Sequence, residues 1–300
     1  MKAGRTAVNL LKTVLQITDA QRMKGQTIPS MECKLNIPYI DDGDDQHKFD
    51  VLYAPNAKIT VIDIHGGSYI MGHRRNNHFF GSKFVEAGFN FISLDYKPND
   101  GNHGVEDLLN DCLTGIKYIF AHQKELGLKD NKFSLTGDSA GGHLVLMLTL
   151  LNDSEKLRST LNMKFKPFPI CGSLVNCPVY EFDHLGYGVD QAELTKQGAK
   201  RLFGPIYIIN EQYRRELSPS TYIKELKTPL FVSTCKNDFL RQHSHRLNED
   251  LTNMNYPNFV YIDIYSDDKK IGHVHNVLEP EYKEGKYINQ SMIDFIKKYA

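Results

Sequence analysis

Apolar runs and amphipathic stretches alternate along most of this chain, and that alternation predicts its architecture. Residues 59–64 are mostly apolar, as a central strand buried on both faces should be. Further strand-like runs cover residues 89–96, 133–136, 170–176, 229–234 and 258–265, while helical spacing marks residues 79–87, 105–120, 144–151 and 284–299. Strand and helix repeated in this order are typical of an α/β fold with a mostly parallel central sheet flanked by helices.

Two segments depart from the alternation. Near the start, residues 5–24 predict an amphipathic helix, followed by two strands joined by an acidic turn, at 31–37 and 48–53. Residues 180–228 are polar and rich in glycine and tyrosine, and they follow directly after a strand. Because an insertion at the carboxyl end of a sheet lies over the binding crevice, we expect one domain, 1–300, with a small helical cap formed by about 1–30 and 180–228. An ordinary surface excursion is the alternative.

Apolar and aromatic side chains within the predicted cap have two interpretations. They either line a pocket for an acyl group or form the core of the cap itself, and the sequence leaves both open. The residues concerned are Leu185, Tyr187, Leu202, Phe203, Tyr207 and Tyr213.

The composition excludes several classes of function. Lysine plus arginine equals aspartate plus glutamate, so there is no overall positive field for nucleic acid. The five cysteines are scattered and show neither zinc-ligand spacing nor a disulfide framework. No apolar run reaches membrane-spanning length, and the first 18 residues lack the features of a signal peptide. We therefore expect a cytoplasmic protein without a nucleic-acid partner and without stable membrane insertion.

The segment 132–144 carries the strongest chemical signal. A short β-type run precedes Gly137-Asp138-Ser139-Ala140-Gly141, and an apolar helical run follows it. A strand that turns sharply into a helix leaves its central side chain at a strained corner, and glycines two residues before and after remove Cβ atoms that would clash there. Ser139 is therefore predicted to stand exposed beside a helix N-terminus, as a nucleophile does.

A serine hydroxyl needs a base, commonly a histidine that a carboxylate orients. In a sheet of this type the acid follows the serine along the chain, and the histidine follows the acid. Asp238 comes directly after the predicted strand 229–234, so it is the candidate acid. His273 or His275, after the last predicted strand, is the candidate base.

Other late residues are weaker candidates. Asp267 and Asp268 are the runner-up acids, but both lie close to the histidine loop in sequence, which is a poor position from which to orient it. His243 and His245 fall in a charge-rich helical stretch and are predicted to lie on a solvated face.

Attack on a carbonyl creates an oxyanion, which requires preorganised N–H donors. The loop His65-Gly66-Gly67-Ser68 follows a central strand upstream of the serine, where such donors belong. His65 is expected to support the loop rather than to react. The predicted oxyanion hole comprises Gly66, Gly67, Ser68 and Ala140, with the backbone N–H groups of the last three as donors.

These motifs together resemble the α/β-hydrolase superfamily and, within it, the hormone-sensitive-lipase-like esterases. The resemblance covers roughly residues 45–300. It implies a carboxylesterase with a Ser139–Asp238–His273 triad, without metal or cofactor, and with a preference for short or medium acyl chains. Ser68 stands where the family often has a third glycine, which leaves the accepted acyl size open. His273 is preferred to His275 because Val274-His275 fills the place of the pair that follows the family's histidine, although the match is imperfect.

The sequence thus predicts hydrolysis of a small-molecule carboxylic ester through an acyl-enzyme intermediate. A serine peptidase or amidase of the same fold is the first alternative. A non-catalytic relative that binds a small molecule is the second. The natural ester is not readable from the sequence, and a homo-oligomer is possible.

Overall fold

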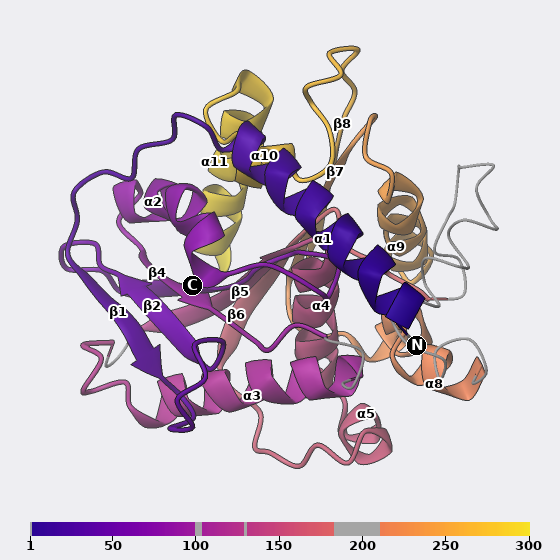
Figure 1. Ribbon diagram of the computed structural model, residues 1–300. Helices are drawn as coiled ribbons and strands as arrows, with labels where there is room; N and C mark the ends of the chain where they lie inside the picture. Colours follow the sequence, from indigo (N-terminus) through magenta and orange to yellow (C-terminus); the bar gives the residue numbers. More distant parts are fainter. Residues whose placement is uncertain (1, 100–103, 129–130, 183–210) are drawn as a thin grey trace.

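The computed structural model describes residues 2–99, 104–128, 131–182 and 211–300. Its centre is an eight-stranded sheet in the order β1-β2-β4-β3-β5-β6-β7-β8. The first two strands pair antiparallel to each other, and β2 pairs antiparallel to β4, whereas every pairing from β4 to β8 is parallel. The predicted mostly parallel sheet flanked by helices is therefore confirmed (Figure 1).

The elements agree with the predicted alternation. The strands are β1 Cys33–Pro38, β2 Lys48–Leu52, β3 Ile59–Ile64, β4 Asn90–Leu94, β5 Lys132–Asp138, β6 Ile170–Asn176, β7 Leu230–Cys235 and β8 Phe259–Ile264. The α-helices among the described residues are α1 Lys2–Arg22, α2 His78–Glu86, α3 Val105–Ala121, α4 Ala140–Asp153, α5 Glu155–Thr160, α8 Glu211–Glu216, α9 Arg241–Asn253, α10 His275–Leu278 and α11 Lys283–Tyr299. Short 3-10 turns occur at η1 Arg74–Asn77, η2 Pro219–Thr221 and η3 Ile223–Glu225.

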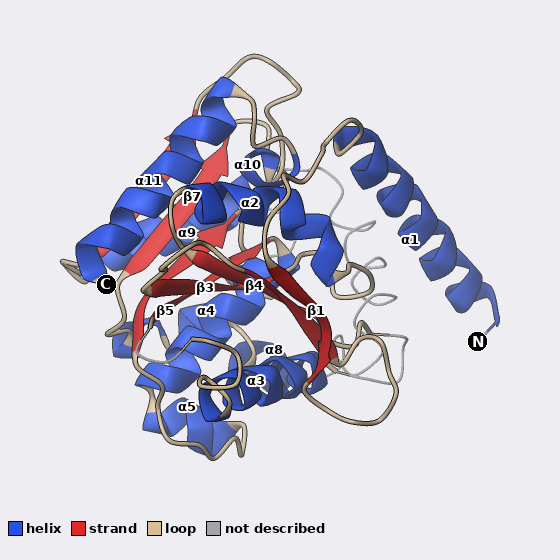
Figure 2. Cartoon of the chain, turned by 90° about the vertical axis from the view of Figure 1, so that its left-hand side faces the viewer, coloured by secondary structure: helices blue, strands red, loops and turns tan. Residues whose placement is uncertain are grey.

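Helices cover both faces of the sheet, as Figure 2 shows. Side chains alternate along β3, so Val61 packs into one apolar cluster with α2 and α11, while Ile62 packs into the other with α3 and α4. This double burial explains why β3 and β4 are mostly apolar and are buried along almost their whole length.

The parallel register brings distant loops to one edge of the sheet. Ile64 at the end of β3 lies opposite Gly137 on β5, and Asp138 lies opposite Asn176 on β6. Asn176 in turn lies opposite Ser233 near the end of β7. The loops that follow β3, β5, β7 and β8 therefore converge, although the ends of β3 and β8 are 200 residues apart in the sequence.

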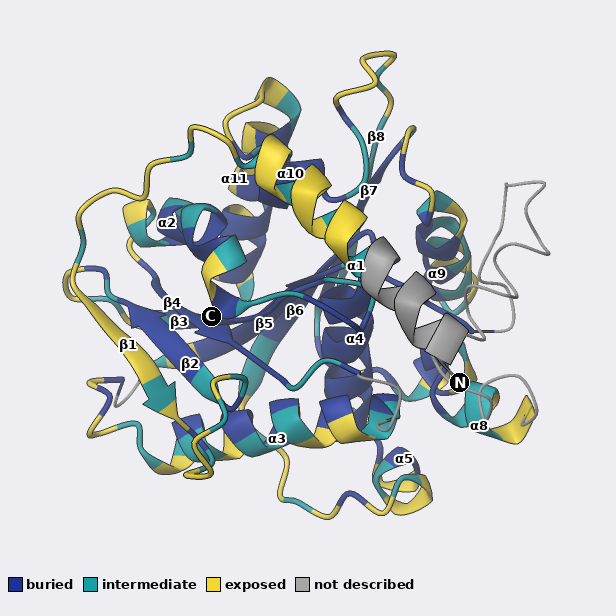
Figure 3. Ribbon diagram, in the orientation of Figure 1, coloured by how far each residue is buried: buried dark blue, intermediate teal, exposed yellow. Residues whose placement is uncertain are grey.

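The N-terminal helix α1 lies apart from the sheet and its covering helices. Figure 1 shows it running diagonally across the front of the molecule, and Figure 3 shows most of its described surface exposed. Val14 and Ile17 are both more than half exposed. Within the described part of the chain, no helix combines the length and apolar character needed to cross a bilayer.

Five of the six residues predicted for the cap lie outside the part of the chain that the structure describes. They are Leu185, Tyr187, Leu202, Phe203 and Tyr207. Tyr213 in α8 is described and half-buried. Its hydroxyl donates to Oε2 of Glu106 at 2.5 Å, so this side chain ties α8 to the start of α3.

Candidate active site

Ser139 occupies the corner between β5 and α4. Its backbone has φ 54° and ψ −119°, a conformation that favours glycine, and its N–H donates to the carbonyl of Asn176 at 2.8 Å. A Cβ atom at Gly141 would lie only 2.0 Å from the carbonyl oxygen of Ile64. The predicted strand, sharp turn and helix are thus present, and the close approach of β3 explains why the helix must begin with small residues.

Three of the predicted site residues come together at this corner. Nε2 of His273 lies 2.8 Å from Oγ of Ser139, and Nδ1 of His273 lies 2.6 Å from Oδ1 of Asp238. The Asp238 carboxylate also accepts hydrogen bonds from the hydroxyl of Thr234 at 2.7 Å and from the N–H of Leu240 at 2.9 Å. The carboxylate is therefore fixed in the orientation that faces the imidazole.

The electrostatics of this arrangement define its proton positions. Burial alone would favour a neutral Asp238, but the adjacent His273 and the bonds from Thr234 and Leu240 lower the pKa of Asp238. An ionised Asp238 accepts the Nδ1 proton of His273, which leaves the Nε2 lone pair facing the hydroxyl of Ser139. Nε2 of His273 can therefore accept the hydroxyl proton of Ser139 during nucleophilic attack.

The alternative base and acids lie elsewhere. His275 is buried in α10, where its Nδ1 lies 3.2 Å from the carbonyl of Gly272 and desolvation lowers the pKa of His275 to about 4. Asp267 is exposed and pairs with Lys236 at 2.5 Å. Asp268 accepts from the N–H of Lys270 in its own loop. Among the histidines that the structure describes, His273 is the one hydrogen-bonded to Ser139.

The prediction that His243 lies on a solvated face of α9 is wrong. This side chain is buried, and its Nδ1 accepts from the N–H of Tyr180 at 3.2 Å. The error arose because the chain leaving β6 packs over α9, a contact that the charged neighbours in the sequence do not reveal. His245 is half-buried and pairs with Asp263 at 2.9 Å.

The loop after β3 forms the facing side of the site. Gly67 has φ 122°, and a Cβ atom there would lie 2.1 Å from the carbonyl oxygen of Met71. Ser68 and Tyr69 also have positive φ, so three consecutive residues turn the backbone sharply. Among the described residues, the N–H groups of Gly67 and Ser68 have no acceptor. They can therefore donate to a developing oxyanion.

Gly66 departs from the expectation that it belongs to the oxyanion hole. Its N–H donates to Oδ1 of Asp138 at 3.1 Å, so the amide is already engaged. Nδ2 of Asn77 donates to the same oxygen at 2.9 Å and to Oδ2 of Asp63 at 3.0 Å. A buried amide thus joins two carboxylates beneath the site, and Gly66 supports the loop.

His65 supports the same loop from its other side, as predicted. Its Nδ1 lies 2.7 Å from the carbonyl of Gly66, its Nε2 lies 3.2 Å from Asp95, and its ring stacks on Tyr96 at 4.5 Å. Burial opposes charge on His65, but Asp95 outweighs that effect and raises the pKa of the imidazole. Asp95 also pairs with the fully buried guanidinium of Arg74.

Several residues around the site carried no sequence signal. Phe239 is 60% exposed, and its ring lies 4.2 Å from that of His273. Cys177 is buried and accepts from the N–H of Val274 at 3.4 Å. Asn77 and Thr234 act through hydrogen bonds that only the folded chain creates, although Thr234 sits at the end of β7, where site residues of parallel sheets gather.

One group in the described part of the chain has the residue types and spacing of a metal site: Cys177, Asp238 and His273. A metal requires the thiolate form of cysteine. Burial, reinforced by Asp238, raises the pKa of the Cys177 thiol well above its usual range. The carboxylate and the imidazole are moreover bonded to each other, so the group fits the proton-transfer arrangement better than metal ligation.

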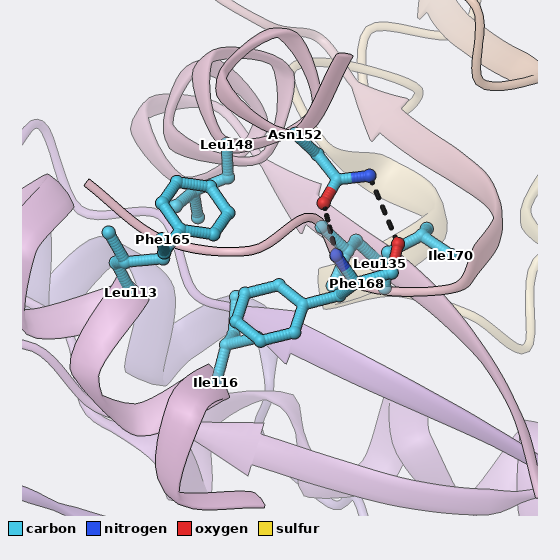
Figure 4. Close-up of a pocket in the computed structure, with 8 residues that line it drawn as sticks. All are labelled: Leu113, Ile116, Leu135, Leu148, Asn152, Phe165, Phe168 and Ile170. Carbon is cyan, nitrogen blue, oxygen red and sulfur yellow. Dashed lines mark hydrogen bonds between the residues drawn. The ribbon is translucent and has the colours of Figure 1, made fainter. Parts of the chain in front are cut away.

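A small apolar cavity lies away from this site, at the far end of α4. Two of its lining residues are joined by hydrogen bonds between the side chain of Asn152 and the backbone of Phe168, at 2.7 and 3.1 Å (Figure 4). The lining is completed by Leu113, Ile116, Leu135, Leu148, Phe165 and Ile170. The cavity is a gap in the packing between α3, α4 and the approach to β6.

The sequence of this chain matches a known protein family. The BD-FAE family model matches residues 49–251. A probable carboxylic ester hydrolase of Mycobacterium tuberculosis, LipM, is 24% identical over 211 residues, which cover 68% of this chain and 48% of that protein. An arylesterase of Saccharolobus solfataricus is 28% identical over 122 residues, 39% of each chain. The chain spans about half or less of the length of these curated relatives.

Solved structures share the whole fold. Esterase B from Lactobacillus rhamnosis has a TM-score of 0.86 at 21% identity, covering 99% of this chain and 95% of that one. An esterase from the archaeon Pyrobaculum calidifontis has a TM-score of 0.72 at 17% identity, covering 98% and 94%. The sheet, its flanking helices and these neighbours define the class as an α/β-hydrolase fold. Within that class, the match over residues 49–251 shows that the chain belongs to the BD-FAE family, a hormone-sensitive-lipase-like esterase family.

Proposed function

We propose that the protein is a serine carboxylesterase in which Ser139 is the nucleophile, His273 the general base and Asp238 the orienting acid. The observation that carries the proposal is the 2.8 Å contact between Nε2 of His273 and Oγ of Ser139. The two groups are within reach of direct proton transfer without any movement of the chain.

The reaction follows from these positions. As Oγ of Ser139 attacks the ester carbonyl, its proton passes to Nε2 of His273, and Asp238 stabilises the imidazolium that forms. The N–H groups of Gly67, Ser68 and Ala140 donate to the oxyanion. His273 then gives the proton to the departing alcohol, which leaves an acyl-enzyme. A water molecule, deprotonated by the same imidazole, hydrolyses the acyl group and restores Ser139.

We infer a small-molecule ester with a short or medium acyl chain as the substrate. The restriction follows from the resemblance to the hormone-sensitive-lipase-like esterases, and Ser68, in place of the family's third glycine, leaves the accepted acyl size for experiment to decide. Relatives bear names as different as arylesterase and isoprenylcysteine alpha-carbonyl methylesterase, so the alcohol group of the substrate is best found with a panel. p-Nitrophenyl acetate, butyrate and octanoate vary the acyl chain, while methyl and aryl butyrates vary the alcohol.

The decisive experiment compares the wild-type chain with Ser139→Ala. The wild-type protein should hydrolyse p-nitrophenyl butyrate and bind one fluorophosphonate per chain at residue 139. The variant should lose both properties while it keeps its circular dichroism spectrum. Hydrolysis at the wild-type rate by the variant would refute the assigned nucleophile. Faster turnover of an aminoacyl amide than of the matched ester would favour a peptidase, and a wild-type chain that does not label would favour a binding protein.

A further inference from the structure

The last residue of helix α1, Arg22, is hydrogen-bonded to the loop that carries His273. Nη1 of Arg22 donates to the backbone carbonyl of His273 at 2.9 Å. Nε and Nη2 of the same guanidinium donate to the two oxygens of Glu279, at 2.7 and 2.5 Å. One arginine therefore connects the first helix of the chain to both ends of α10.

The carbonyl that Arg22 holds belongs to a strained corner. Val274, the next residue, has φ 49° and ψ 33°, a left-handed conformation that a β-branched side chain rarely adopts. Such a conformation persists only where the surroundings enforce it. On the inner side, Sγ of Cys177 accepts the N–H of Val274. On the outer side, Arg22 binds the carbonyl of His273.

The geometry of the guanidinium suits this task. Glu279 binds the Nε and Nη2 edge as a fork, which fixes the plane of the group and aims Nη1 at the carbonyl. Both side chains are largely buried, with 22% of Arg22 and 11% of Glu279 exposed. A lysine has one rotating ammonium on a flexible stem and cannot reproduce this three-point arrangement.

We propose that Arg22 is a positioning residue for the base of the proposed esterase reaction, and that α1 is thereby part of the catalytic apparatus. The inference rests on the proposed function. Arg22 touches neither the serine nor the substrate. It acts by holding the backbone of His273 at the position that keeps Nε2 within reach of Oγ of Ser139.

The docking of α1 has a second anchor, which makes the inference testable. Nε2 of Gln26 donates to the carbonyl of Leu278 at 2.5 Å, four residues beyond Arg22. Removal of Arg22 should therefore leave the chain attached to α10 while it frees the carbonyl of His273. The effect on turnover can be separated from the loss of the helix.

The experiment measures kcat for p-nitrophenyl butyrate per active site, with active sites counted by fluorophosphonate labelling. The variants are Arg22→Met, Arg22→Lys, Glu279→Gln and the double variant Arg22→Met/Glu279→Gln. The double variant leaves no buried carboxylate without a partner, so it remains folded if the single change does not. Gln21→Ala, an exposed neighbour on α1, is the matched control.

We expect Arg22→Met and the double variant to lose about 10- to 100-fold in kcat per labelled site, with KM changed by less than threefold. Arg22 and Glu279 act as one hydrogen-bonded pair, and both variants lose that pair. The kcat of the double variant should therefore fall no further than the kcat of Arg22→Met. Glu279→Gln should lose less, since Arg22 can still reach the carbonyl. Arg22→Lys should recover the melting temperature without recovering kcat, and Gln21→Ala should match the wild type.

A double variant whose kcat per labelled site stays within twofold of the wild type would overturn the inference. So would an Arg22→Lys variant in which kcat recovers together with the melting temperature, because that result describes a purely structural ion pair. Failure of the proposed function looks different: the wild-type chain itself would then neither label nor hydrolyse the ester.

Discussion

Oδ1 of Asp238 lies 2.6 Å from Nδ1 of His273, although 35 residues separate the two in the sequence. The contact is possible because β7 and β8 are adjacent parallel strands whose loops leave the sheet at the same edge. Thr234 and Leu240 hold the carboxylate in place, so its charge is directed at one nitrogen of one imidazole.

This relationship predicts a large loss of activity in Asp238→Asn. An amide can donate its NH₂ to Nδ1, which leaves the proton on Nε2 and removes the lone pair that must accept the serine proton. We expect kcat to fall on the order of 10⁴-fold while the fold persists. Asp267→Asn, at an exposed acid of the neighbouring loop, should keep wild-type turnover of p-nitrophenyl butyrate. Activity of Asp238→Asn within tenfold of the wild type would contradict the assigned role.

The strained backbone of Ser139 predicts a difference between two inactive variants. Ser139→Ala keeps the Cβ atom and therefore the strain at φ 54°, whereas Ser139→Gly relieves it. We expect the glycine variant to be more stable than the alanine variant by about 1 kcal/mol in the free energy of unfolding. Urea denaturation measures the difference. Equal stability, or a less stable glycine variant, would show that the corner holds no strain.

The parts of the site formed by contiguous residues could be predicted, because neighbours in the sequence determine their local conformation. Glycines flanking Ser139 and the run His65-Gly66-Gly67 are contiguous in sequence, and each has a steric reason to be where it is. The acid and the base followed from chain order, because parallel strands place successive loops at one edge. The preference for His273 over His275 came from the resemblance, through the imperfect match of Val274-His275, whereas chain order alone left both open; the structure places Nε2 of His273 at Ser139.

The long-range part was not predictable for a physical reason. Arg22 meets its partners across more than 250 residues, and nothing near it in the sequence marks that contact. His243 was expected in solvent because its neighbours are charged, yet the chain around Tyr180 buries it. Gly66 was placed in the oxyanion hole without a role as a donor, and a glycine-rich loop does not reveal that its N–H binds Asp138.

The buried carboxylates beneath the site predict an unusual response to pH. Burial, reinforced by Asp138, raises the pKa of Asp63 well above its usual range, which favours the protonated form of this side chain in the folded protein. An unfolded aspartate ionises near pH 3.9. Folding therefore binds a proton above that pH, and this group makes the folded state less stable as the pH rises.

Asp63→Asn removes this titration and keeps a neutral acceptor for the amide of Asn77. The stability of the variant relative to the wild type should rise by at least about 1 kcal/mol between pH 4.5 and pH 7.5. Urea denaturation at both pH values provides the measurement, with Asp267→Asn as the exposed control that shows no such rise. A difference that stays constant with pH would mean that Asp63 is ionised in the folded protein.

Two buried histidines predict loss of stability in mild acid. Desolvation lowers the pKa of His143 to about 4, and it does the same to His275. The neutral imidazole of His143 donates from Nε2 to the carbonyl of Leu217 at 2.8 Å, between the rings of Tyr69 and Phe182. An unfolded histidine has a pKa near 6.5, so the unfolded chain binds more protons between about pH 6.5 and pH 4.

These pKa values determine how stability changes with pH. Each histidine contributes stability that is complete above about pH 6.5 and is lost as the pH falls towards 4, by up to about 3 kcal/mol per group. His143→Gln retains a donor for Leu217 but does not titrate. Between pH 7 and pH 4.5 the variant should therefore lose about 2 kcal/mol less than the wild type, and His143→Gln/His275→Gln should reduce the loss further. Urea denaturation at the two pH values decides the matter, because identical losses in wild type and variant would show that His143 is not held neutral by its burial.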